Sequence, residues 1–190
     1  MSPTDQRNPA EAALRIARAF AARNIPYALG GALAYNVWGV PRATVDADLN
    51  VFVDIESLDP VFAVLHSLDL AFDEPVARTA ARQDGLMIVH DGACRVDLFV
   101  PSIDFSWEAA QTICQVRIGD EEVKVLSAEA LAVFKLLFFR GKDIVDLERL
   151  IGVQQKRLDA AYVRRKIVEM MGEEDERVQR WDELVREHMR

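Results

Sequence analysis

The sequence predicts an α+β fold, with a mixed β-sheet flanked by helices and a C-terminal helical region. Up to residue 126, short apolar runs separated by turn signals alternate with helical patterns, which is typical of strands interleaved with helices. From residue 127 onward, the apolar residues recur only at helical spacing. The 190 residues, 51% of them hydrophobic, are enough to bury a core. We therefore expect an α/β core over 1–126 and a helical region over 127–190 that packs on it.

The first half of the chain is expected to alternate helices with strands. Asn8, Pro9 and Glu11 form a helix-start signal, with a capping residue, a proline at the first helical position and an acid in the first turn. Residues 73–84 show no clear period, so we expect an exposed loop with a little strand there. The other segments predict helices over 8–24, 32–38 and 58–68, the last capped by Ser57, and strands over 26–29 and 47–53.

Two hairpins and four helices are expected in the rest of the chain. Apolar runs over 85–89 and 93–100 are separated by His90-Asp91-Gly92, and a second pair of runs is separated by Gly119-Asp120. The second pair predicts strands over 112–118 and 122–126. The remaining segments predict helices over 127–139, 143–151, 159–171 and 173–189.

Two adjacent glycines and two closely spaced acids stand out in this pattern. Asp46 and Asp48 are two residues apart on a predicted strand, so their side chains share one face. Two carboxylates this close repel each other unless a cation lies between them, and Mg²⁺ is held by such carboxylates together with substrate phosphates. Gly30 and Gly31 allow backbone N–H groups to approach a phosphate at the start of a helix. The stretch therefore predicts a site for metal and phosphate.

Two segments carry a resemblance to a known family, namely Gly30-Gly31 and Arg42-x-Thr44-x-Asp46-x-Asp48. They resemble the signature of the DNA polymerase β-type nucleotidyltransferase superfamily and are most similar to the group containing the abortive-infection nucleotidyltransferase toxins. The resemblance covers roughly residues 29–150 and implies a nucleotidyltransferase-like fold. The chain departs from the commoner form of the glycine turn, because Ala32 stands where a Ser or Thr hydroxyl usually touches phosphate.

The resemblance implies that Asp97, on a neighbouring strand, is a third catalytic and metal-binding carboxylate beside Asp46 and Asp48. An Asp within an apolar strand is seldom buried unless it is paired or binds a metal. The alternative is an ion pair with Arg95, which lies two residues away on the same strand face.

Four further residues are candidates for nucleotide binding. Arg42 and Thr44 alternate in phase with the acids, and Arg42 would either bind phosphate or offset the acids. Lys135 interrupts an apolar helical stripe; its stem could snorkel to water, whereas the resemblance implies that it reaches the triphosphate. The resemblance also includes an R-x-K-D-x-x-D-L pattern starting at Arg140, in which Asp143 would hold Lys135 or a base.

The resemblance implies a Mg²⁺- or Mn²⁺-dependent transferase that moves a nucleoside monophosphate from an NTP, such as ATP, to a hydroxyl acceptor. The acceptor would be an RNA end, a protein or a small molecule, and a toxin neutralised by an antitoxin partner fits the same family. The alternatives are a nucleotide-binding module without transfer activity, which Ala32 favours, and a partner-binding protein that uses its acidic C-terminal helices.

The composition argues against several other classes of protein. The net charge of −8 argues against a general nucleic-acid binder, and the cations between Lys156 and Lys166 are expected to be a solvated helix face balanced by acids. No apolar run approaches the length of a membrane span, and residues 1–9 are polar rather than of signal-peptide type. With only Cys94 and Cys114, a disulfide framework is excluded and a cytoplasmic location is expected.

Overall fold

The computed structural model describes residues 8–189, so the polar residues 1–7 lie outside the described part of the chain. Its residues group into two units. The sheet unit comprises Ala43–Leu126 and the described residues up to Leu33. The helical unit comprises Ala34–Arg42 and the described residues from Ser127 onward. The sequence did not indicate that 34–42 would group with the C-terminal helices, and the predicted boundary after residue 126 and the packing of the two regions stay predictions.

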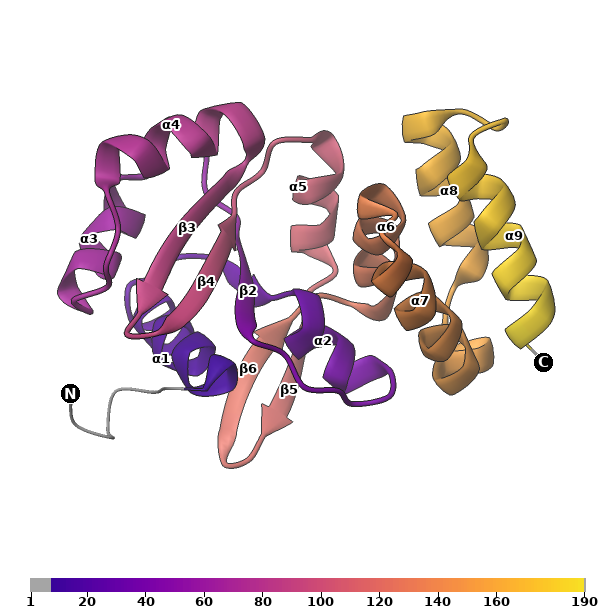
Figure 1. Cartoon of the computed structure of the whole chain (residues 1–190), viewed down its shortest axis with the longest axis horizontal. Coiled ribbons are helices and arrows are strands. Elements are labelled where there is room, and N and C mark those ends of the chain that lie inside the picture. Colours follow the sequence, from indigo (N-terminus) through magenta and orange to yellow (C-terminus); the bar gives the residue numbers. More distant parts are fainter. Residues whose placement is uncertain (1–7, 190) are drawn as a thin grey trace. The chain divides into compact units, whose positions relative to one another are not determined.

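A six-stranded mixed sheet organises the sheet unit, in the order β3-β4-β2-β1-β6-β5 (Figure 1). The pairs β1–β6 and β2–β4 are parallel, whereas β1–β2, β3–β4 and β5–β6 are antiparallel. The mixed sheet and both predicted hairpins are therefore confirmed. The strands are β1 (Tyr27–Leu29), β2 (Asp46–Val51), β3 (Leu86–Asp91), β4 (Cys94–Phe99), β5 (Cys114–Ile118) and β6 (Glu121–Val125).

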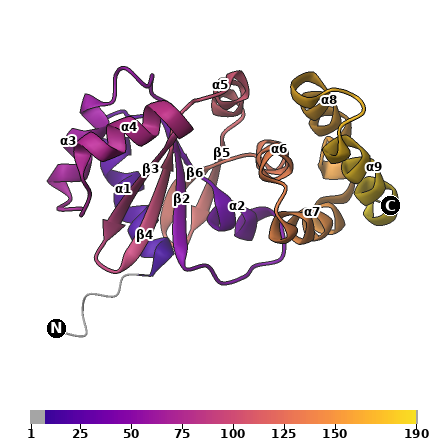
Figure 2. The same cartoon turned by 45° about the horizontal axis from the view of Figure 1, so that its top comes forward.

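Helix α1 (Pro9–Ala22) covers one face of the sheet, beside β1, β2 and β4 (Figure 2). It begins as the sequence predicts, because the Asn8 side chain accepts from the Glu11 N–H and Glu11 accepts from the Asn8 N–H. Ile16 and Phe20 are completely buried in the core, together with the alternate residues of β2 and β4 that include Ala47, Leu49, Val96 and Leu98. Because side chains alternate along a strand, the residues between them belong to the opposite face.

Three more helices belong to the sheet unit: α3 (Asp59–Ser67), α4 (Glu74–Asp84) and α5 (Asp104–Gln111). The prediction of a loop over 73–84 is wrong, because α4 occupies that segment. Asp73 caps the helix by accepting from the Val76 N–H, and Gly85 ends it in the left-handed region at φ +66°. Ser57 as the cap of α3 is also wrong, since Leu58 occupies the capping position without a side-chain hydrogen bond.

The helical unit contains part of α2 (Gly31–Trp38), then α6 (Ala128–Phe138), α7 (Gly141–Gln154), a short 3₁₀ turn, α8 (Ala160–Met171) and α9 (Glu176–His188). Ser127 caps α6 through the Ala130 N–H, and the indole N–H of the buried Trp181 on α9 donates to the Ala160 carbonyl. The predicted C-terminal helices are thus all present. None of the helices that the structure describes is both long and apolar enough to cross a membrane.

Candidate active site

The parallel pairing of β2 with β4 brings the predicted acids together on one face of the sheet. In this register Asp48 lies opposite Asp97, and Asp46 lies opposite Arg95. Residues opposite each other on paired strands point to the same face. The face opposite the α1 core therefore carries three carboxylates and one guanidinium, supplied by two neighbouring strands.

The glycine pair lies directly against this face. The Gly30 N–H donates to the backbone carbonyl of Asp48 at 2.8 Å. Gly31 has φ +46°, and a Cβ added to it would lie 1.8 Å from Asp48 Oδ2. A side chain at position 31 would thus occupy the place of the Asp48 carboxylate, and the positive φ adds a second reason for glycine. A Cβ added at position 30 would lie 2.5 Å from Asn50 Nδ2, so the Asn50 side chain would have to move to admit it.

Thr44, a predicted nucleotide-binding residue, interacts with the first acid. Its hydroxyl lies 2.8 Å from Asp46 Oδ1 and 3.1 Å from the Asp46 carbonyl oxygen. The hydroxyl can donate its one hydrogen to either acceptor. When it donates to Oδ1, Thr44 helps to orient the Asp46 carboxylate at the start of β2. A phosphate contact of Thr44 stays a prediction.

Arg95 forms a two-pronged ion pair with Asp97. Its Nε donates to Oδ1 at 2.6 Å and its Nη2 to Oδ2 at 3.1 Å. These hydrogen bonds, followed by the attraction of Asp97 and more weakly of Asp46 and Asp48, raise the pKa of Arg95. The Arg95 side chain is 48% exposed and that of Asp97 only 11%. The ion pair between Arg95 and Asp97, which the sequence offered as the alternative to a metal-binding Asp97, is therefore present. It lies on the same face as Asp46 and Asp48.

The three acids are suitable ligands for a divalent metal ion and lie on the same face of the sheet. Their side-chain positions in this structure do not form a complete metal site. Carboxylate oxygens are the ligands that Mg²⁺ and Mn²⁺ prefer. The room that Gly31 leaves for the Asp48 carboxylate fits such a site. Among residues 8–189, however, no three His, Cys, Asp or Glu side chains are grouped closely enough to hold a metal ion. Asp97 is instead bonded to Arg95, and Asp46 to Thr44.

A second cluster of charges lies within the helical unit. Lys135 Nζ on α6 lies 2.7 Å from Asp146 Oδ2 and 3.4 Å from Asp143 Oδ1, both on α7. Arg42 donates to Asp146 through Nε at 3.0 Å and Nη2 at 2.9 Å, and Arg140 Nε donates to Asp143 at 2.6 Å. We call these five residues the buried ion cluster, because Lys135, Asp143 and Asp146 are at most 4% exposed.

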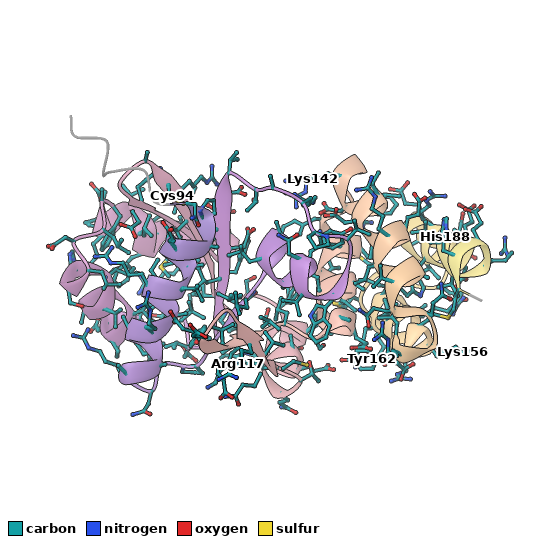
Figure 3. The ribbon with its side chains drawn as sticks, turned by 90° about the horizontal axis from the view of Figure 1, so that it is seen from below. Cys94, Arg117, Lys142, Lys156, Tyr162 and His188 are labelled. Carbon is teal, nitrogen blue, oxygen red and sulfur yellow. The ribbon has the colours of Figure 1, made fainter. Side chains whose placement is uncertain are left out.

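The buried ion cluster changes the interpretation of Arg42 and Lys135. Arg42 offsets an acid, but that acid is Asp146 rather than Asp46 or Asp48. Snorkelling of Lys135 to water is wrong, since its side chain is only 5% exposed. The prediction that Asp143 interacts with Lys135 is met by the 3.4 Å contact, while nucleotide contacts of Arg42, Lys135 and Asp143 stay predictions. Lys142, the neighbour of Asp143, is exposed and extends away from the start of α7 (Figure 3).

Burial and hydrogen bonding act in opposite directions on the pKa of Asp146. Burial alone would raise it, but the hydrogen bonds from Arg42 and Lys135, with their charges, outweigh burial and lower the pKa below its ordinary value. The Tyr35 ring lies beside the same cations, with its centroid 5.3 Å from Lys135 Nζ and 5.6 Å from Arg42 Cζ. Burial raises the pKa of the Tyr35 hydroxyl, so this group stays neutral at physiological pH.

The basic segment near the C-terminus is balanced by acids. Arg164 pairs with Glu173 and Asp182, and Lys166 lies 2.8 Å from Glu169. Arg164 and Lys166 are thus neutralised by acids of the same unit rather than forming a bare basic groove.

Comparisons with known proteins identify the fold. No family model matches the sequence, and no curated protein matches it either. The structure is similar to that of ANT(2'')-Ia in complex with adenylyl-2''-tobramycin, with a TM-score of 0.58 and 20% identity, covering 79% of this chain and 89% of that one. A solution structure of the antibiotic-resistance factor ANT(2'')-Ia gives a TM-score of 0.60 at 19% identity, covering 92% and 94%.

The lincomycin-bound lincosamide antibiotic adenylyltransferase LnuA gives a TM-score of 0.53 at 18% identity, covering 77% of this chain and 99% of that one. At identities this low, the structural similarity establishes the fold alone. The activity of this chain has to be inferred from its own residues. The mixed sheet and its flanking helices therefore form the nucleotidyltransferase-like fold that the sequence predicts.

Proposed function

We propose that this protein is a divalent-metal-dependent nucleotidyltransferase that transfers a nucleoside monophosphate from an NTP to a hydroxyl group. The observation that carries the proposal is the face shared by Asp46, Asp48 and Asp97, with the Gly30-Gly31 turn against Asp48. The fold shared with the antibiotic-modifying structures supports it.

In this proposal each group has a distinct role. Asp46 and Asp48 would hold the Mg²⁺ or Mn²⁺ ions, which when bound neutralise the triphosphate and polarise its α-phosphorus, and Asp97 would share one of these ions. Gly30 and Gly31 would bring backbone N–H groups close to the phosphates. Asp97 would orient the acceptor hydroxyl and take its proton. The acceptor oxygen then bonds to the α-phosphorus as the bond to pyrophosphate breaks.

The acceptor we favour is a hydroxyl on a small polar molecule. The fold neighbours include a complex with adenylyl-2''-tobramycin and the lincomycin-bound lincosamide antibiotic adenylyltransferase LnuA, so ATP is the first nucleotide to test. The net charge of −8 and the acid-balanced segment around Arg164 disfavour a long RNA acceptor. A toxin role with an antitoxin partner, and a protein acceptor, have only the sequence resemblance in their support.

One alternative has specific observations in its favour, namely a nucleotide-binding module without transfer activity. Ala32 offers no hydroxyl to phosphate, and Asp97 is engaged by Arg95. Against it, all three carboxylates are present on one face. The two functions differ in whether Asp97 matters after the nucleotide has bound.

The decisive experiment combines binding and transfer. We expect α-labelled ATP with Mg²⁺ to label an aminocyclitol- or lincosamide-type compound more strongly than RNA or protein from a cell extract. Asp97→Asn should bind Mg²⁺–ATP nearly normally while transfer falls about 10²-fold or more, because a group at the reacting centre is lost. Asp48→Asn should lose binding and transfer together, because it removes a ligand of the metal that bridges to the triphosphate.

The exposed Asp84 on α4 offers a matched control, and Asp84→Asn should leave binding and transfer unchanged. Binding is followed by thermal unfolding, in which triphosphate at a hundred times Kd stabilises by about 2.7 kcal/mol. This stabilisation should disappear with excess chelator. If the wild type binds Mg²⁺–ATP, labels no acceptor with any NTP, and Asp97→Asn behaves like it, the binding module replaces the enzyme.

A further inference from the structure

We call the group of Asp46, Asp48, Asp97 and Arg95 on β2 and β4 the acid face, and Arg95 is the member of this group that carries a positive charge, as a metal ion does. It lies opposite Asp46 in the β2–β4 register and grips both oxygens of Asp97. Three carboxylates on one face would repel one another without a cation, and the guanidinium supplies a positive charge among them. In this structure the Arg95 guanidinium thus supplies the positive charge beside the carboxylates that a bound divalent cation would otherwise supply.

The exposed fractions of the two side chains allow Arg95 to separate from Asp97. The Arg95 side chain is 48% exposed, so water can solvate its guanidinium when it leaves Asp97. Asp97 is only 11% exposed, so it needs a cation partner whenever Arg95 is absent. The planar fork that fits a carboxylate fits a phosphate equally well. A triphosphate is therefore a chemically suitable alternative partner for the released side chain.

We infer that Arg95 is a built-in counter-ion that competes with the divalent cation for Asp97 and releases Asp97 when the triphosphate binds its guanidinium. This inference rests on the proposed function, because it concerns the same carboxylates and the same nucleotide. It makes metal and nucleotide binding mutually dependent, since each partner is bound better once the other has separated Arg95 from Asp97. Arg95 is then a positioning residue, which keeps Asp97 from taking up metal before the nucleotide arrives.

The test measures Mn²⁺ binding rather than transfer. Free Mn²⁺ gives a sharp electron paramagnetic resonance signal that is lost on binding, so affinity is read with and without a non-hydrolysable ATP analogue. In the wild type we expect weak binding of Mn²⁺ alone and much tighter binding with the analogue. In Arg95→Gln, Mn²⁺ alone should bind about tenfold tighter, as expected for removal of a half-exposed charged competitor. The added effect of the analogue should shrink.

Arg82 supplies a matched control. It belongs to the same unit, is 55% exposed, and donates to both oxygens of Glu56 at 3.2 and 2.9 Å. Arg82→Gln changes the net charge equally but leaves the acid face intact, so its Mn²⁺ affinity should equal that of the wild type. Arg95→Lys keeps the charge without the fork and should fall between the wild type and Arg95→Gln.

Two contrary results are distinguishable. If Asp48→Asn abolishes Mn²⁺ binding but Arg95→Gln binds no tighter than Arg82→Gln, the counter-ion inference is overturned and the proposed metal site stands. If Mn²⁺ does not bind with the analogue, or binds equally in Asp48→Asn, the metal site itself is wrong and the inference falls with it. Should Arg95→Gln fail to fold, the comparison of Arg95→Lys with Arg82→Lys decides the same question.

Discussion

Both units hold a cluster of acids and cations, yet the two clusters differ in burial and in the number of partners. In the buried ion cluster, Asp146 receives hydrogen bonds from Arg42 and Lys135, and the acids and the lysine are shielded from water. On the acid face, Asp97 has one half-exposed guanidinium as its cation, and Asp48 is only partly buried. Charges of the first kind are fixed by their neighbours, whereas those of the second kind can exchange partners.

The difference in burial predicts that the buried ion cluster mainly affects the stability of the fold, whereas the acid face mainly affects the binding of cations. A buried ion that loses its partner destabilises the fold strongly, because desolvation is then uncompensated. A crowded, partly exposed set of like charges gains from any cation that reaches it. We therefore expect substitutions in the buried ion cluster to change stability, and substitutions on the acid face to change binding.

The largest expected effect is on Asp146. Asp146→Asn removes the charge that both Lys135 and Arg42 face, and should lower the free energy of unfolding by about 3–5 kcal/mol. Asp48→Asn is the comparison, and should change it by less than about 0.5 kcal/mol because it removes a partly exposed charge. Urea unfolding followed by circular dichroism measures both. Equal losses in the two variants would break the distinction between the clusters.

A smaller effect is expected at the glycine turn, where it separates backbone strain from the loss of the site. Gly31→Ala should lower the free energy of unfolding by about 1–2 kcal/mol because of its positive φ, and more if the Asp48 carboxylate cannot move aside. Gly119→Ala has a similar φ of +61° but no neighbour within 4 Å of its added Cβ, so it shows the backbone effect alone.

Only Gly31→Ala should also weaken Mg²⁺-dependent ATP binding, because only its added Cβ would displace a proposed metal ligand. Calorimetric titration with Mg²⁺–ATP checks this. ATP binding that is equally strong in both variants would show that the position of Asp48 is not needed.

The smallest expected effect is a pH dependence of the buried ion cluster. The pKa of Asp146 is lower in the folded protein than its ordinary value of about 3.9, so below that pH the unfolded chain binds the proton more readily. The stabilisation is therefore complete above about pH 4 and is lost as the pH falls through the folded pKa. The difference in unfolding free energy between the wild type and Asp146→Asn should shrink from pH 5 to pH 3. A constant difference would show that Asp146 gains nothing from its charge.

Much of the fold was readable from local patterns. The Asn8–Glu11 capping box and the two hairpin turns give strong local signals, and the structure has the predicted elements there. Helix α4 was missed because its buried residues are only Ala77 and Ala81, which leave almost no apolar period in a polar segment. Its ends were nevertheless marked, by Asp73 before the helix and by Gly85 after it.

The candidate site was predictable in its residue types and strand phase but not in its pairings. The i, i+2 spacing placed Asp46 with Asp48, and Arg95 with Asp97, on common faces. That these two faces are the same depends on the β2–β4 register, which no local pattern fixes. The pairing of Arg42 with Asp146 likewise joins residues far apart in the chain, where sequence spacing has no predictive power.

The β2–β4 pairing has a consequence for how the protein folds. Parallel neighbours cannot be joined by a tight turn, and the chain passes through α3, α4 and β3 between these two strands. Closing so long a loop is entropically unfavourable and slows folding relative to local hairpins. Asp48 and Asp97 therefore meet only after this non-local step, so a folding intermediate with its hairpins formed would still lack the acid face.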